Sequence, residues 1–271
     1  MDLLRKAGPL EPGYTSVVAG DTFQLKYLKM GLLRLDVSAR SYEENSGEDE
    51  IVLDLLSGTC NVHVEGEDMW KDIGSRRSFF DDPPAMVYIP RKQRWRIEAP
   101  DPPVLALVFR ASARRDTAPA IVRPDAARTV AIGRDNWQRT AAMAVTDNVD
   151  ADRLIVGETY NLPGHWSSYP PHKHDNAATP DEAPYEEIYY FAVEPKQGFG
   201  IQRVYTAPDD PKPLDEVYVV RDGDAVVIPR GYHPVAAAGG YRVGYVWALA
   251  GDDRRFGAWS VDPDHAWLTD A

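Results

Sequence analysis

The sequence has one cysteine in 271 residues, Cys60, and no long apolar run. A single cysteine excludes an internal disulfide and suits a reducing compartment, so we expect a cytoplasmic protein. The longest clean apolar run, residues 104–109, is far shorter than the roughly 20 residues that cross a bilayer. The first segment, MDLLRKAGPLEPG, also lacks the apolar stretch of a signal peptide. We therefore expect no membrane association.

Positive charge is also scarce. The 30 Lys and Arg residues are outnumbered by 42 Asp and Glu residues, which gives a formal net charge of −12. Nucleic-acid binding needs a basic surface, so we expect no nucleic-acid partner. The overall negative field would also repel an anionic substrate, which would have to be held by a local basic cluster.

Turn-forming residues, by contrast, are abundant. The chain has 22 Pro and 20 Gly residues, and they separate short apolar runs. This spacing is typical of an all-β sandwich or barrel. The expected strands of the first half are residues 51–56, 59–64, 85–89 and 104–109, and those of the second half are 154–160, 187–193, 199–206, 216–220, 225–228 and 241–248. Residues 110–138, rich in Ala, Arg and Pro, are expected to connect the halves.

A weak internal repeat supports two related halves. The segment AMVYIPR at residues 85–91 resembles AVVIPR at residues 225–230, and each is an apolar strand that runs into Pro-Arg. The second copy continues with Gly231, Tyr232 and His233, where the first has Lys92, Gln93 and Arg94. The pattern favours a duplicated β-barrel in which the first copy lacks a histidine.

The sharpest local pattern is the His-x-His pair formed by His172 and His174, which follows two prolines. Residues two apart on a strand point to the same face, so both imidazoles can face a barrel interior while Lys173 faces away. A His-x-His pair alone is more often two surface histidines than a metal site. Further ligands elsewhere in the chain are needed to favour the metal.

A carboxylate and a third histidine meet this need. Glu187 opens the aromatic strand EIYYF, and a carboxylate on the inner face of such a strand is costly unless it is paired or bound to a metal. Glu186 would point outward, whereas Glu182 stays open because the intervening loop has no fixed phase. His233 follows a short strand between Gly223 and Gly231. Three imidazoles and a carboxylate suit one divalent ion, such as zinc, manganese or iron.

These segments resemble the two cupin motifs, although thirteen residues separate His174 from Glu187 instead of three or four. Longer strings resemble the 5-deoxy-glucuronate isomerase family of myo-inositol catabolism. They are PGHWSSYPPHKHD at residues 163–175, EEIYYF at 186–191, QGFGIQRVYT at 197–206, IPRGYHPV at 228–235 and DPDHAW at 262–267. The resemblance implies a bicupin fold: an N-terminal cupin barrel without metal ligands in residues 1–120, and a C-terminal barrel with the metal site in residues 121–271.

The resemblance also implies the reaction, which converts 5-deoxy-D-glucuronate to 5-dehydro-2-deoxy-D-gluconate. A bound divalent ion, zinc by first preference, can polarise the carbonyl of such a sugar acid. Candidates for the general base are Glu187, Tyr189 and Tyr205. Alternative functions are a ketol isomerase for another deoxy-hexosulose-uronate, a cupin dioxygenase and a non-catalytic sugar-acid-binding cupin.

The substrate carboxylate needs a fork of hydrogen-bond donors, which Arg supplies best. Arg203 is the first choice, with Arg230 and Lys173 next. His165 and His265 also lie in the family strings, but their spacing assigns them no role. An aromatic, β-rich surface makes a homo-oligomer plausible.

Overall fold

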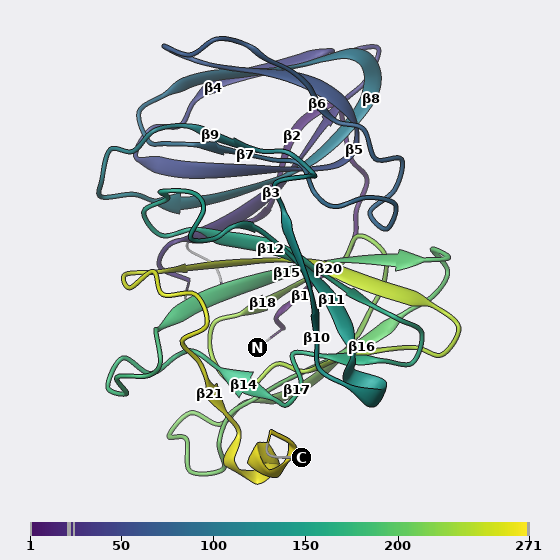
Figure 1. The fold of residues 1–271 in the computed structure, drawn as a ribbon, viewed down its shortest axis with the longest axis vertical. Coiled ribbons are helices and arrows are strands. Elements are labelled where there is room, and N and C mark those ends of the chain that lie inside the picture. Colours follow the sequence, from purple (N-terminus) through teal and green to yellow (C-terminus); the bar gives the residue numbers. More distant parts are fainter. Residues whose placement is uncertain (1, 21–22, 24, 270–271) are drawn as a thin grey trace.

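The fold was examined in a computed structural model that describes residues 2–20, 23 and 25–269. The chain folds into two stacked β-structures: the purple-to-blue N-terminal half lies above the green-to-yellow C-terminal half (Figure 1). This confirms the predicted all-β, two-barrel cupin fold. Among the described residues, neither of the two short 3-10 helices has the length or apolar character to cross a membrane.

The N-terminal half is built on one eight-stranded sheet. Its strand order is β2-β3-β8-β5-β7-β9, with β4 paired to β8 and β6 paired to β5. The bounds are β2 Gly13–Val18, β3 Leu28–Leu35, β4 Ser41–Asn45, β5 Asp49–Val64, β6 Trp70–Gly74, β7 Met86–Ile89, β8 Arg94–Ser112 and β9 Ala120–Val122.

The C-terminal half combines three sheets. A seven-stranded sheet has the order β1-β18-β15-β20-β12-β11-β10, a four-stranded sheet has the order β13-β19-β16-β17, and β14 pairs with β21. The bounds are β1 Leu4–Arg5, β10 Arg128–Ile132, η1 Asp135–Trp137, β11 Arg139–Val145, β12 Ile155–Asn161, β13 Trp166–Ser167, β14 His172–Lys173, β15 Tyr185–Glu194, β16 Gly200–Tyr205, β17 Asp215–Val220, β18 Ala225–Ile228, β19 Val235–Ala237, β20 Arg242–Gly251, β21 Ser260–Val261 and η2 Pro263–Leu268.

The expected strands are present, with two differences. Residues 51–56 and 59–64 belong to one strand, β5, whose register shifts between Leu55 and Asn61 allow it to bend. The expectation of a plain connection at residues 110–138 is wrong, because this segment contains β9, β10 and η1 as well as the end of β8. The polar, Ala-rich composition of this segment gave no strand pattern, because β9 and β10 each pair along one edge only.

The division at residue 120 remains a prediction, and two short strands bear on it. Strand β9 begins at Ala120 and pairs with β7 of the N-terminal sheet. Strand β1, near the N-terminus of the chain, lies in the lower half beside β18 (Figure 1). The N-terminal segment therefore contributes to the C-terminal sheet.

Strand alternation distributes apolar side chains among three cores. Ile51 and Leu53 of β5 pack inside the N-terminal half, and Tyr189 and Phe191 of β15 pack inside the C-terminal half. The intervening side chains, such as Val52 of β5 and Ile188 of β15, form a third core between the halves. Because both faces of these strands are buried, their central residues are mostly apolar.

Two glutamates at matching positions bind the halves to each other. Glu50 accepts backbone hydrogen bonds from Asp152, Arg153 and Leu154, each at 2.7 Å. Glu186 does the same in the other direction, accepting from the backbone N–H groups of Lys26, Tyr27 and Leu28 at the start of β3. Each carboxylate thus satisfies three backbone donors of the opposite half.

Candidate metal centre

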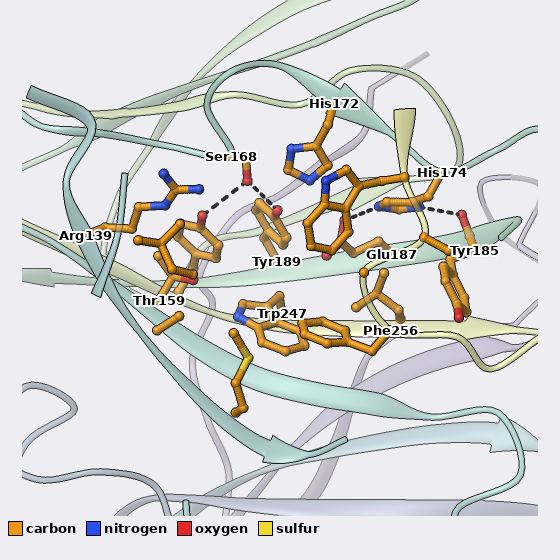
Figure 2. A pocket seen from close by; sticks show the side chains of 18 residues that line it. Arg139, Thr159, Ser168, His172, His174, Tyr185, Glu187, Tyr189, Trp247 and Phe256 are labelled. Atoms are coloured by element: carbon orange, nitrogen blue, oxygen red, sulfur yellow. Dashed lines mark hydrogen bonds and ion pairs between the residues drawn. The ribbon is translucent and has the colours of Figure 1, made fainter. Parts of the chain in front are cut away.

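A cavity opens on the inner face of the seven-stranded sheet in the C-terminal half. Histidines, tyrosines and one arginine face it, and an apolar wall that includes Trp247 and Phe256 closes one side (Figure 2). The residues that line it are Ile132, Arg139, Ala141, Met143, Thr159, Ser168, His172, His174, Tyr185, Glu187, Tyr189, Tyr245, Trp247, Leu249, Phe256, Gly257, Ala258 and Trp259.

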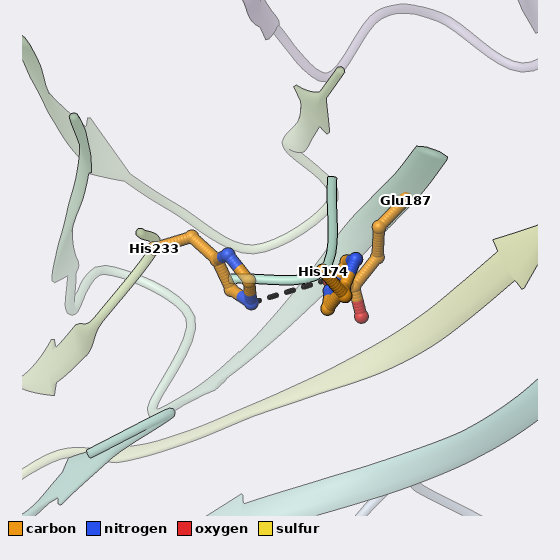
Figure 3. A group of neighbouring side chains, drawn as sticks. All are labelled: His174, Glu187 and His233. Carbon is orange, nitrogen blue, oxygen red and sulfur yellow. Dashed lines mark hydrogen bonds and ion pairs between the residues drawn. The ribbon is translucent and has the colours of Figure 1, made fainter. Parts of the chain in front are cut away.

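Three buried side chains converge beside this cavity. Oε2 of Glu187, near the start of β15, lies 3.1 Å from Nε2 of His174 and 3.3 Å from Nε2 of His233. One ligand atom from each residue lies within 4.8 Å of the others. Figure 3 shows the two imidazoles directed toward the carboxylate. The sequence-predicted residues His174, Glu187 and His233 are thus brought together from three separate segments.

The contacts of the Nδ1 atoms of His174 and His233 explain the orientation of the two rings. Nδ1 of His174 lies 3.2 Å from the carbonyl oxygen of Tyr185, and Nδ1 of His233 lies 2.9 Å from that of Gly231. A proton on Nδ1 that is donated to a carbonyl leaves Nε2 as the metal-binding lone pair. Nε2 of His233 is buried and has no hydrogen-bond partner among the described residues. This donor set fits a first-row divalent ion.

Burial and charge set the protonation of the histidines. Burial lowers the pKa of His172 and of His233 to about 3, so both imidazoles are neutral near pH 7. Burial also acts to lower the pKa of His174, but the hydrogen bond and charge of Glu187 outweigh it and raise the pKa. Neutral imidazoles are the form in which histidine binds a metal.

His172 lies next to these three residues. Its ring centroid is 4.9 Å from that of His233 and 6.3 Å from that of His174. The other face of the ring lies near Trp259, with the centroids 5.2 Å apart. His172 lines the cavity, whereas the compact group of ligand atoms consists of His174, Glu187 and His233.

The two alternative carboxylates have other partners. Glu182 accepts hydrogen bonds from the backbone N–H groups of Asp175 and Asn176 and from Nζ of Lys173. It therefore holds together the long loop that separates His174 from Glu187. Glu186 faces the N-terminal half and accepts from the β3 backbone. Of the three glutamates considered, only Glu187 lies with the histidines.

The two tyrosine candidates occupy different places. Tyr189 lines the cavity, its hydroxyl lies 2.8 Å from Oγ of Ser168, and its ring stacks on Tyr245 with the centroids 4.2 Å apart. Burial raises the pKa of Tyr189 well above its usual value, so the hydroxyl stays protonated. Tyr205 does not line this cavity, and its hydroxyl donates to Oδ2 of Asp262 at 2.6 Å.

The three cations expected to bind the substrate do not reach the cavity. Arg203 pairs with Asp215 at 2.7 Å, Arg230 pairs with Asp210 at 2.7 Å, and Lys173 pairs with Glu182 at 3.2 Å. The alternation of β16 explains the position of Arg203: Gln202 and Val204 are buried, and Arg203 points outward and is exposed. The prediction for these three residues therefore disagrees with their placement.

Arg139 is the cation that the sequence reasoning missed. It opens β11 and lines the cavity together with the histidines. Its position in the segment expected to be a connection concealed it. The available signal was the alternation of Arg139, Ala141 and Met143, which places all three on one strand face.

His165 and His265 lie outside the cavity lining. His165 is partly exposed, and its Nδ1 lies 2.8 Å from the carbonyl oxygen of Gln138. His265 belongs to η2, and its ring centroid lies 6.4 Å from that of Tyr169. Both positions are consistent with packing at the rim of the C-terminal half.

The fold and the site together define a bicupin with a candidate metal centre in its C-terminal half. The chain belongs to the KduI/IolB family, whose sequence profile matches residues 3–268. A 5-deoxy-glucuronate isomerase of Geobacillus thermodenitrificans is 33% identical over 271 residues, covering 99% of this chain and 96% of the relative. A second protein of that name, from Halalkalibacterium halodurans, is 35% identical over 272 residues and covers 98% of each chain.

Solved structures agree with this assignment. An IolB-like protein from Salmonella typhimurium LT2 superposes with a TM-score of 0.91 at 31% identity, covering 99% of this chain and 100% of that one. The formate complex of Lactobacillus farciminis oxalate decarboxylase superposes with a TM-score of 0.69 at 12% identity, covering 100% of this chain and 91% of that one. The second likeness concerns the fold alone.

Proposed function

We propose that this chain is a 5-deoxy-glucuronate isomerase, which converts 5-deoxy-D-glucuronate to 5-dehydro-2-deoxy-D-gluconate in myo-inositol degradation. We further propose that it works with one divalent ion held by His172, His174, Glu187 and His233. Two lines of support are membership of the KduI/IolB family over residues 3–268 and relatives of that name at 33–35% identity. The observation that carries the metal site is the group of three buried ligand atoms within 4.8 Å of one another.

An aldose–ketose isomerase must move hydrogen between two adjacent carbons of a hydroxy-aldehyde. A divalent ion held by these residues would supply Lewis-acid polarisation of the substrate carbonyl. The chain prepares this site with one carboxylate and three imidazoles, of which burial keeps those of His172 and His233 neutral. The Nδ1 contacts of His174 and His233 with backbone carbonyls keep their Nε2 atoms directed inward.

Tyr189 is the residue we assign to handle charge on the substrate oxygens. Its hydroxyl faces the cavity and remains protonated at neutral pH, because burial raises its pKa. It can therefore donate a hydrogen bond to an oxygen on which negative charge develops. Glu187 would serve as the base only if it did not hold the metal, and its Oε2 already faces both histidines. We leave Tyr205 out of the proposal, since its hydroxyl is engaged by Asp262.

Zinc is the metal we propose. Histidine nitrogen and carboxylate oxygen are common zinc ligands, and catalytic zinc sites keep a position open for water or substrate. Manganese and iron bind similar donors, so elemental analysis of the purified protein must decide among them.

We also propose that the protein is cytoplasmic and that it can form a homo-oligomer. The buried thiol of Cys60 agrees with a reducing, cytoplasmic setting. Val217 and Val219 of edge strand β17 are exposed on the outer face of the four-stranded sheet, where they could support self-association. Size-exclusion chromatography with light scattering would measure the oligomeric state.

The assay that tests the function uses purified protein, 5-deoxy-D-glucuronate and nuclear magnetic resonance to follow the ketose product. We expect turnover that stops on chelation and returns with zinc, and we expect His174→Ala to lose both the metal and the activity while staying folded. Turnover of a deoxy-hexosulose-uronate in place of 5-deoxy-glucuronate would assign a different isomerase. Oxygen consumption with bound iron would point to a dioxygenase, and full activity of metal-stripped protein would refute the metal dependence.

A further inference from the structure

One arginine in the cavity has no described acidic partner. Arg139 donates hydrogen bonds only through Nη1, to the carbonyl oxygens of Trp137 and Tyr169, each at 3.1 Å. Within the described part of the chain, Nε and Nη2 make no hydrogen bond, and no carboxylate lies within ion-pair distance of the guanidinium. The Nε and Nη2 donors of the guanidinium are therefore available to a ligand.

Arg139 is partly buried, and its partners differ from those of the most deeply buried arginine in the described part of the chain. Arg76, the buried arginine between the two halves, is paired with both Glu158 and Asp54. Acidic residues outnumber basic ones by 42 to 30, so partners are plentiful. Burial lowers the pKa of Arg139. A partly buried guanidinium without a counter-ion has donors available for an anionic ligand.

The position of Arg139 in the cavity suggests which anion this is. Figure 2 places its guanidinium on the opposite side of Ser168 and Tyr189 from His174. The substrate of the proposed reaction has its aldehyde and its carboxylate at the two ends of a six-carbon chain. A molecule whose aldehyde lies at the histidines would extend past Tyr189 toward Arg139.

We propose that Arg139 binds the carboxylate of the sugar-acid substrate and so fixes which end of the chain reaches the candidate metal centre. This inference rests on the proposed isomerase function. The guanidinium offers a planar fork of donors that matches the two carboxylate oxygens, and a low-dielectric site strengthens the pair. In a protein with a net charge of −12, it is also the local positive charge that gathers an anionic substrate.

The neighbours of Arg139 fit the deoxy carbon. Ala141 and Met143 follow it on the same face of β11, and Ile132 is its pairing partner on β10. These apolar side chains offer no partner to a hydroxyl. In 5-deoxy-glucuronate the carbon next to the carboxylate is a CH₂ group and needs none.

The test compares two substrates on matched variants. One is 5-deoxy-glucuronate, and the other is 5-deoxy-glucose, in which CH₂OH replaces the carboxylate. Arg139→Gln should raise KM for the acid by roughly 10- to 150-fold, the range for loss of a charged hydrogen-bond partner. The variant should leave kcat/KM for the neutral sugar within about threefold, because the carboxylate is the group it no longer binds. Arg139→Lys, which keeps the charge, should recover part of the loss.

The matched control is Arg203→Gln, which removes an exposed arginine that is already paired with Asp215. It should leave KM for the acid unchanged within about twofold, since surface ion pairs contribute little. An unchanged KM in Arg139→Gln would overturn the inference. Equal losses on the acid and the neutral sugar would also overturn it, because they would indicate a structural role for the contacts with Trp137 and Tyr169.

A binding experiment separates this inference from the proposed function. The ligand is the unreactive hydroxy acid made by reducing the substrate aldehyde to an alcohol, and calorimetry measures its Kd without any turnover. Binding by the wild type that weakens at least about tenfold in Arg139→Gln supports the inference even if the protein isomerises nothing. Equal Kd values for wild type and Arg139→Gln would overturn it even if the isomerase assay succeeds.

Discussion

The two halves of the molecule pair their strands in the same register, but they have different residues at one of the matching positions. On β15, Glu187 pairs with Ile228 of β18, and on β5, Ile51 pairs with Ile89 of β7. Each isoleucine of β7 and β18 is followed by Pro-Arg, so the sequence repeat and the strand pairing agree. Ile51 therefore occupies in the N-terminal half the position that Glu187 occupies in the C-terminal half.

The difference between these two positions lies in their surroundings. Ile51 is fully buried in an apolar core, whereas Glu187, almost as deeply buried, has two histidine nitrogens within 3.3 Å. Five residues after Ile228 the chain reaches His233, but five residues after Ile89 it reaches Arg94, which is exposed. At this interior position a carboxylate is therefore found in the half where histidines, and a metal in our proposal, compensate its charge.

The residues just before Ile51 and Glu187 are the same in the two halves and make the same kind of contact. Glu50 and Glu186 each precede the compared residue by one, and each binds three backbone N–H groups of the other half. Neighbouring residues on a strand face opposite ways, so this position points out of each half toward its partner. The contacts of Glu50 and Glu186 are therefore matched, whereas the neighbouring interior positions differ between the halves.

The largest effect should come from making the C-terminal half resemble the N-terminal one. Glu187→Ile places an apolar side chain among the histidines, and we expect loss of the bound metal and a fall in activity of about 10³-fold or more, since Lewis-acid stabilisation is worth several kcal/mol. Stability should change little, because replacing a buried charge with a well-packed apolar group is often neutral. Elemental analysis, kinetics and thermal melting measure the three quantities.

His63→Ala is the control for this experiment, since it removes an exposed histidine from β5 of the N-terminal half. It should keep both metal and activity. One equivalent of tightly bound metal in Glu187→Ile would contradict the assignment of the carboxylate.

The reverse substitution should cost stability and add no site. Ile51→Glu buries a carboxylate in a core without a described histidine partner, and we expect a loss of about 3–5 kcal/mol in the free energy of unfolding. Urea denaturation measures it, with Ile51→Val as the volume control at about 1 kcal/mol. A second bound metal ion, or a loss below that of the valine variant, would show that the halves are more alike than their cores indicate.

The smallest effects should come from the two inter-half glutamates. A glutamine offers one acceptor oxygen in place of two, so some of the three backbone donors lose their partner. Glu50 is fully buried and Glu186 is partly exposed, so we expect about 2–4 kcal/mol for Glu50→Gln and about 1–2 kcal/mol for Glu186→Gln. Denaturant unfolding of both variants, beside Glu65→Gln at an exposed position, tests the order. A larger loss at Glu186 would contradict it.

Local periodicity was sufficient for much of this architecture. Alternation placed Glu187 and Tyr189 on one face of a strand and Glu186 on the other, and the structure has this arrangement. The same rule would have excluded Arg203, which stands between buried Gln202 and Val204 on β16. Alternation could not predict the direction of the Glu182 side chain, because Glu182 lies in the loop before β15 and not on a strand. The hydrogen bonds of Glu182 to residues 173, 175 and 176 exist only once that loop has folded.

The sequence by itself determined the all-β class, most of the strands, and the residue types that suit a metal, because these depend on periods of two and on side-chain chemistry. Only the tertiary structure decided that His174, Glu187 and His233 meet, since the three come from segments 13 and 46 residues apart whose approach depends on strand pairing. It also decided that Arg139 faces the same cavity, whereas the predicted cations Arg203, Arg230 and Lys173 do not. The residues that compensate a buried charge are often distant from it in sequence. A local sequence pattern therefore cannot predict them.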